Sequence, residues 1–214
     1  MGKLEMTDTS VEQPMPNEEP HAERPTMDAL WTRHESWLTS NYPDGLLTLN
    51  DGASVAELST LEKTLGQQLP DDYRSWLSSH NGDNGNEAGL LWSNEFMSTD
   101  RVASQWQMMV TLSEQNIRDI PTESDPKGHI VPVWWHRHWI PITSDGAGNL
   151  ECLDLTPGPN GTIGQIIDYD NETIHRTVLA SSFREWISEF VERVEAGEYG
   201  YSQDYGRLMP FEEM

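Results

Sequence analysis

WIPITSDGAGNLECLDLTPGPNGTIGQIIDYD, residues 139–170, decides the fold, because it reads as three short strands joined by two glycine-rich turns. The apolar runs lie within 139–142, 150–155 and 163–167. The first turn centres on Asp145-Gly146-Ala147-Gly148, and the second contains Asn160-Gly161. Glycine adopts a positive φ in such turns without a Cβ clash, and Asn-Gly between apolar runs is a strong hairpin signal. The stretch therefore predicts two consecutive hairpins.

Helix signals flank this stretch on both sides. Ser54 and Glu57 form the S-x-x-E pattern of a capping box, and Gly66 stands where a helix favours a left-handed residue at its end. A second helix is expected after Pro70, whose missing N–H costs nothing in a first turn. Ser182 repeats the capping pattern before a strongly amphipathic helix near the C-terminus. The sequence also predicts helices from Met27 and after Ser98 or Thr99, and strands at 90–92 and 173–179.

Two groups of motifs occur in a fixed order along the chain. The first is E..LG..LP.DYR.WL..HNG, residues 62–82, and the second is W.PI.SDGAGN..CLDL.PGP.GT.GQII.YD, residues 139–170. Together they resemble the SUKH superfamily, nearest to its branch of fungal cell-wall-assembly regulators, from about Ser54 to about Val194. The resemblance implies an α+β domain whose helices pack on a curved, mostly antiparallel sheet. It also implies either a toxin-immunity role, as for bacterial members, or the role of a regulatory scaffold, as for fungal members, and it transfers no catalytic residues.

The chain is strongly acidic, with 36 aspartates and glutamates against 13 lysines and arginines and a formal net charge of −23. Such a field repels phosphate backbones and anionic lipid, so direct binding to nucleic acid or membrane is not expected. It attracts a basic partner instead. The alternative explanation is that the acidic residues only keep the protein soluble, which also accounts for the net charge. The single cysteine, Cys152, excludes an internal disulfide and fits the reducing cytoplasm.

Three segments follow from the change of composition along the chain. Residues 1–25 carry four prolines and little apolar periodicity, which predicts a disordered acidic tail. Residues 26–198 hold the predicted elements and form the expected SUKH-like domain. Residues 199–214 are an aromatic, acidic tail for which the pattern favours neither order nor disorder. No apolar run is long enough for a membrane span, and no secretion signal is visible at the N-terminus.

An enzymatic alternative rests on the histidines beside the first strand. His136 and His138 face the same side if they continue a strand, and His129 is a third candidate metal ligand. A metal site also needs a carboxylate or cysteine ligand and second-shell partners, and the local sequence supplies none. We therefore expect neither a metal site nor a cofactor, and a metal-dependent hydrolase is the least favoured function.

The leading expectation is a bacterial immunity protein that neutralises a cognate toxin by stoichiometric binding. Its partner would be a basic toxin domain, such as a nuclease. The alternative is a regulatory scaffold of the fungal type. Acidic residues in predicted turns or at strand ends are expected to be exposed and to bind the partner. These candidates are Asp83, Glu87, Asp145, Asp168, Asp170 and Glu172.

Overall fold

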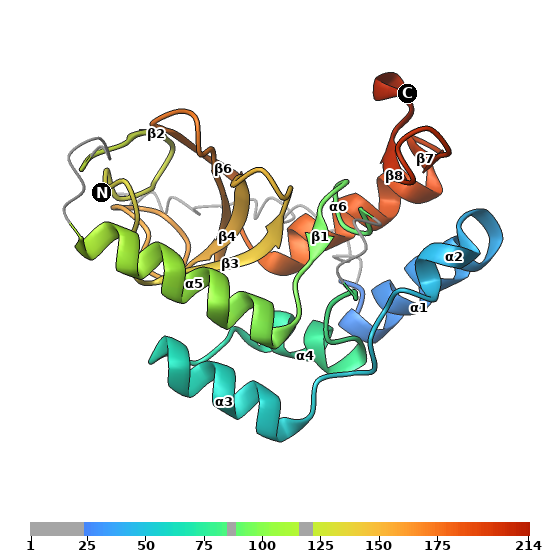
Figure 1. The fold of residues 1–214 in the computed structure, drawn as a ribbon, viewed down its shortest axis with the longest axis horizontal. Helices are drawn as coiled ribbons and strands as arrows, with labels where there is room; N and C mark the ends of the chain where they lie inside the picture. The colour runs from blue at the N-terminus through green and yellow to red at the C-terminus, as the bar shows by residue number, and fades with distance from the viewer. Residues whose placement is uncertain (1–23, 85–88, 116–121) are drawn as a thin grey trace, which may run out of the picture.

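The computed structural model describes residues 24–84, 89–115 and 122–214. The predicted tail at 1–25 lies outside them except for Arg24 and Pro25, and Glu87 also lies outside. None of the helices in these described ranges is long and apolar enough to cross a bilayer. The described chain forms an α+β fold, as predicted, with helices around an open and mostly antiparallel sheet (Figure 1).

The sheet has the strand order β1-β3-β4-β5-β6-β2 within the described residues. Its centre is the predicted three-stranded stretch, and all neighbours are antiparallel except β2 and β6. Leu153 pairs with Ile140 on one side and with Ile166 on the other, and all three side chains are fully buried. The strands are β1 (Glu95–Phe96), β2 (Asp125–Lys127), β3 (Trp139–Ser144), β4 (Leu150–Asp154), β5 (Gln165–Tyr169) and β6 (His175–Ala180).

The helices form the other part of the core. α1 packs on α4 and α6, α4 also packs on α6, and α3 packs on α5, which in turn covers β3 (Figure 1). At the centre of the first group, the rings of Trp31 and Trp76 stack with centroids 3.8 Å apart. The helices are α1 (Met27–Asn41), α2 (Pro43–Leu46), α3 (Val55–Leu65), α4 (Asp71–Ser79), α5 (Thr99–Glu114) and α6 (Phe183–Glu195).

The predicted caps are present at three helix starts. Ser54 Oγ accepts a hydrogen bond from the backbone N–H of Glu57, whose carboxylate accepts from the backbone N–H of Ser54, so the capping box of α3 is confirmed. Ser98 caps α5. Ser182 caps α6, but the Glu185 carboxylate binds the backbone N–H of Ser181 instead of that of Ser182. The second box is therefore only half formed.

One central segment differs from the sequence expectation, and the C-terminal segment, which the pattern left open, forms a hairpin. The prediction of a strand at 90–92 is wrong, because Leu91 forms only an isolated bridge to Asn94 across a turn, and the edge strand β1 begins at Glu95. Residues 199–214 form a hairpin of β7 (Tyr199–Ser202) and β8 (Arg207–Pro210), followed by the short helix η1 (Phe211–Glu213). This hairpin lies beside the end of α6 and buries Leu208 completely (Figure 1).

Candidate functional site

Four of the six predicted acidic residues gather at one end of the sheet. Asp145 follows β3, and Asp168, Asp170 and Glu172 lie at or after the end of β5. The two turns are joined directly, because the side-chain oxygen of Asn149 accepts a 2.8 Å hydrogen bond from the backbone N–H of Asn171. We call the four carboxylates Asp145, Asp168, Asp170 and Glu172 the acidic sheet end.

Two of these four carboxylates also shape the turns that carry them. Asp145 Oδ1 accepts hydrogen bonds from the backbone N–H groups of Ala147 and Asn149, at 2.8 and 2.9 Å. Asp170 accepts from the backbone N–H groups of Glu172 and Thr173, and the Glu172 bond is the main cause of the lowered pKa of Asp170. These carboxylates therefore stabilise the turns by hydrogen bonds to the backbone, while their charge remains at the surface of the turns.

A buried arginine anchors this end of the sheet from beneath. The guanidinium of Arg176 lies 4.1 Å from the centroid of the Tyr169 ring and donates to the backbone carbonyls of Asp170 and Thr173, at 3.1 and 3.2 Å. Burial lowers its pKa, opposed by the charge of Asp168 among others. The buried cation thus holds the 170–173 turn and offsets part of the negative charge above it.

Asp83 does not belong to the acidic sheet end, and the prediction that its side chain is exposed is wrong. The residue is only 4% exposed. Its carboxylate accepts a 2.9 Å hydrogen bond from the backbone N–H of Phe96, and its own N–H donates to the Phe96 carbonyl at 2.8 Å. Asp83 therefore fastens the edge strand β1 to the chain after α4. Glu87 cannot be placed, since it lies outside the described residues.

Glu151 is an acidic residue that the sequence reasoning did not single out. It lies on β4 between Leu150 and Cys152 and pairs across the ladder with Asp168. Its carboxylate accepts hydrogen bonds from the Thr143 hydroxyl and from Asn94 Nδ2. Burial raises the pKa of Glu151 to about 7, and the charges of Asp168 and Asp145 raise it further against those hydrogen bonds. The sequence signal for its burial was its position between two apolar residues, in a strand that is covered on both faces.

We expect Glu151→Gln to stabilise the protein at pH 8 and to have little effect at pH 4. The pKa of Glu151 is raised in the folded state, so its favourable contribution is complete below the unfolded value of 4.5 and is lost as the pH rises through about 7. The full pKa shift of Glu151 corresponds to about 3 kcal/mol in the free energy of unfolding. Because the Glu151 side chain is partly exposed, we expect the gain to be about 2 kcal/mol. Urea unfolding of both proteins at the two pH values measures it.

Comparing the two proteins at each pH removes the contribution of His34. Burial lowers the pKa of this histidine to about 4, so the wild-type protein loses stability as the pH falls from 6.5 towards 4. The Glu151→Gln protein shares that loss, so the loss cancels when the free energies of unfolding of the two proteins are subtracted at the same pH. A variant that is equally stabilised at pH 4 and pH 8 would show that the ionised Glu151 carboxylate is not the destabilising group.

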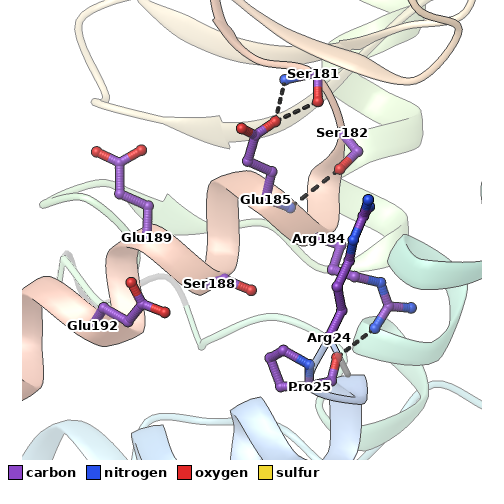
Figure 2. Close-up of a pocket in the computed structure, with 9 residues that line it drawn as sticks. All are labelled: Arg24, Pro25, Ser181, Ser182, Arg184, Glu185, Ser188, Glu189 and Glu192. Atoms are coloured by element: carbon purple, nitrogen blue, oxygen red, sulfur yellow. Dashed lines mark hydrogen bonds between the residues drawn. The ribbon is translucent and has the colours of Figure 1, made fainter. Parts of the chain in front are cut away.

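A second acidic surface borders a groove of about 460 Å³ along α6 (Figure 2). Glu185, Glu189 and Glu192 are spaced by four and three residues, which places them on one face of the helix. Within the described chain neither Glu189 nor Glu192 forms an ion pair. We call Glu185, Glu189 and Glu192 the α6 acidic face.

The opposite wall of the groove comes from the start of the described chain. Arg24 and Pro25 lead into α1, and one guanidinium nitrogen of Arg184 donates to the Pro25 carbonyl at 2.5 Å (Figure 2). The backbone N–H of Arg184 also donates to the Asp72 carboxylate at 3.1 Å, which ties α6 to α4. The groove is thus built on packed helices, and it was missed by the sequence reasoning because its walls are far apart along the chain.

The histidine pair does not form a metal site in the described structure. His136 and His138 lie in the loop before β3, with ring centroids 5.1 Å apart, and His136 Nδ1 accepts the backbone N–H of His138. Burial and the neighbouring charges of His138 and Arg137 lower the pKa of His136. Across residues 24–84, 89–115 and 122–214, no group of three or more histidine, cysteine, aspartate or glutamate side chains is placed to hold a metal ion.

Comparison with known proteins places most of this fold in one family. The family model described as "SMI1 / KNR4 family (SUKH-1)" matches residues 52–189. Similar curated proteins include "KNR4/SMI1 homolog 2" of Debaryomyces hansenii, 28% identical over 84% of this chain and 37% of its own length. The "Glucan synthesis regulatory protein" of Neurospora crassa is 25% identical over 83% of this chain and 40% of its own length. The "Cell wall biosynthesis/cell cycle regulator smi1" of Schizosaccharomyces pombe is 27% identical over 86% and 39%.

These comparisons correct the expected function. The relatives come from fungi, and three of them are named as regulators of glucan synthesis or of the cell wall, so the prediction of a bacterial toxin-immunity protein is wrong. The alternative of a fungal regulatory protein agrees with them. The chain spans about two-fifths of the length of these relatives. No enzymatic name occurs among them, and their names are those of regulators.

Proposed function

The chain belongs to the SMI1/KNR4 (SUKH-1) family, and from this premise we propose that it is a regulatory protein of cell-wall assembly that acts by binding a partner. The observation that carries the proposal is the match to cell-wall regulators over more than four-fifths of the chain. The names of those relatives describe regulation, which supports a role in binding a partner.

The charge distribution favours a basic partner. The chain carries a net charge of −23, and two of its acidic surfaces lie on rigid elements, the α6 acidic face on a helix and the acidic sheet end on two hairpin turns. Clustered surface charge accelerates the encounter with a partner of opposite sign and weakens with rising ionic strength. We propose that the α6 acidic face contacts the partner, because its three carboxylates line a groove at the surface.

The proposal is tested by gene replacement in the organism that encodes the chain. Deleting the gene is expected to lower the glucan content of the cell wall, and the wild-type gene is expected to restore it. A gene carrying Glu189→Gln and Glu192→Gln should restore less, because two negative charges are lost from the groove. The measurements are cell-wall glucan per dry mass and the thermal midpoint of each purified protein, so that misfolding is recognised.

Glu212→Gln with Glu213→Gln is the matched control. It removes the same number of charges from exposed residues of η1, outside the groove. We expect this control to restore the glucan content fully. A deletion strain with an unchanged wall contradicts the cell-wall role. Equal loss in both double variants would show that total charge, and not the α6 acidic face, determines partner binding.

A further inference from the structure

The groove beside α6 carries opposite charges at its two ends. Arg24 and Arg184 lie at the end where α6 begins, and Glu189 and Glu192 lie farther along the helix (Figure 2). The first turn of α6 adds the partial positive charge of a helix N-terminus to the arginine end. The groove therefore has a cationic end and an anionic end, although the chain as a whole has a net charge of −23.

The cationic end includes one carboxylate, Glu185, but that group is bound within its own turn. It accepts hydrogen bonds from the backbone N–H of Ser181, at 2.9 Å, and from the Ser181 hydroxyl. These bonds are the main cause of the lowered pKa of Glu185, and the charge of Arg24 lowers it further. Arg24 is thus near enough to act on Glu185, yet it is exposed and forms no ion pair with any described residue.

The cations nearest to the anionic end are already engaged elsewhere. Arg33 interacts with the charge of Glu192, but its guanidinium is hydrogen-bonded to Glu195, at 2.9 and 2.5 Å. Arg193 is likewise hydrogen-bonded to Glu198, at 2.6 Å. Both carboxylates of the anionic end are exposed and have no counter-ion within residues 24–84, 89–115 and 122–214. Each end of the groove is therefore open to a charge of opposite sign from another molecule.

We propose that the groove beside α6 binds a segment of the partner that carries one acidic and one basic residue, and that Arg24 selects the acidic one. The basic residue pairs with Glu189 and Glu192, and the acidic residue pairs with the Arg24 guanidinium. This inference rests on the proposed function and names the segment that meets the α6 acidic face. From Glu185 to Glu192 the helix rises about 10 Å, which is about three residues of an extended segment.

A segment with basic residues only fits this groove less well. One of its cations would lie beside Arg24 and Arg184, and the juxtaposition of like charges disfavours binding. The net charge of −23 has the opposite effect, because it attracts a purely basic peptide more strongly than a neutral one. The groove and the overall charge therefore predict opposite orders of affinity for the two kinds of segment.

The test is an NMR titration of the 214-residue chain with two blocked peptides, acetyl-Glu-Ala-Ala-Arg-amide and acetyl-Arg-Ala-Ala-Arg-amide, at pH 7 and constant ionic strength. The backbone amide signals of residues 185–192 are expected to shift saturably. The dissociation constant is expected to be about threefold lower for the mixed peptide, the effect of one exposed ion pair. Arg24→Gln should abolish this preference. Lys63→Gln, which removes one positive charge from an exposed site on α3, is the matched control and should preserve it.

Arg24→Gln keeps the experiment interpretable, because Arg24 is exposed and its replacement should leave the fold intact. Three results would overturn the proposal. The wild-type protein binds the purely basic peptide as tightly as the mixed one, or Arg24→Gln retains the preference for the mixed peptide, or neither peptide shifts the signals of residues 185–192 saturably. None of these results changes the glucan content measured after gene deletion, so the cell-wall role and the mixed-charge segment fail separately.

Discussion

Replacing Trp76 by alanine is expected to lower the free energy of unfolding by about 3–5 kcal/mol, the usual cost of removing a buried tryptophan. The Trp76 side chain is completely buried at the junction of α1, α4 and α6. Its ring stacks on Trp31 and meets the edge of Phe183 at a centroid distance of 6.0 Å. Removing the ring leaves a cavity between α1, α4 and α6, and α6 also carries the α6 acidic face.

The loss is measured by urea unfolding followed by circular dichroism, with Met108→Ala as the control. Met108 is 48% exposed on α5, so its replacement should change the stability by less than about 0.5 kcal/mol. The Trp76 indole N–H has no hydrogen-bond partner in the described chain, and its removal returns a small part of the loss. A measured loss below about 1 kcal/mol would mean that α4 is not part of the core.

Gly82→Ala is expected to cost about 3 kcal/mol or more, whereas Gly66→Ala is expected to cost about 1 kcal/mol. The two glycines have similar φ values, +74° and +68°, so alanine pays a similar conformational penalty at each. They differ in their surroundings. A Cβ atom on Gly82 would lie 2.3 Å from the backbone nitrogen of Ser98, while one on Gly66 meets nothing within 4 Å.

The clash at Gly82 cannot relax easily, because its neighbours are fastened on both sides. Asn81 Oδ1 accepts the backbone N–H of Thr99 at 2.8 Å, and Asp83 is bonded to the backbone of Phe96. Urea unfolding of the two single variants gives both values under the same conditions. Equal losses at the two positions would show that the backbone conformation alone sets the cost and that the approach to Ser98 is unimportant.

Local signals in the sequence were sufficient for most of the helices and for the centre of the sheet. The capping box at the start of α3 needs only Ser54 and Glu57, and the left-handed end of that helix needs only Gly66. Both are present. The three-stranded stretch carries its own turns, so its register is set locally. The apolar run at 90–92 misled the prediction, because a short run indicates burial but does not specify a strand.

The function could be predicted only in part from the sequence. The motifs indicated the superfamily and were nearest to its fungal branch, but the function was predicted as bacterial immunity, and the relatives overturned that prediction. A shared fold determines packing and leaves the partner-contacting surface free to vary. The motifs therefore carried no signal for the α6 acidic face.

The sequence by itself determined the fold class, the helix caps and the central hairpins, since these follow from interactions between residues close together in the chain. Only the tertiary structure decided that Asp83 is buried and that Arg24 and Pro25 line a groove beside α6. Burial and local charge depend on segments brought together from distant parts of the chain, and residue types give no information about those contacts. The acidic composition indicated a basic partner, and the packing of the helices and turns decided which carboxylates are placed to meet it.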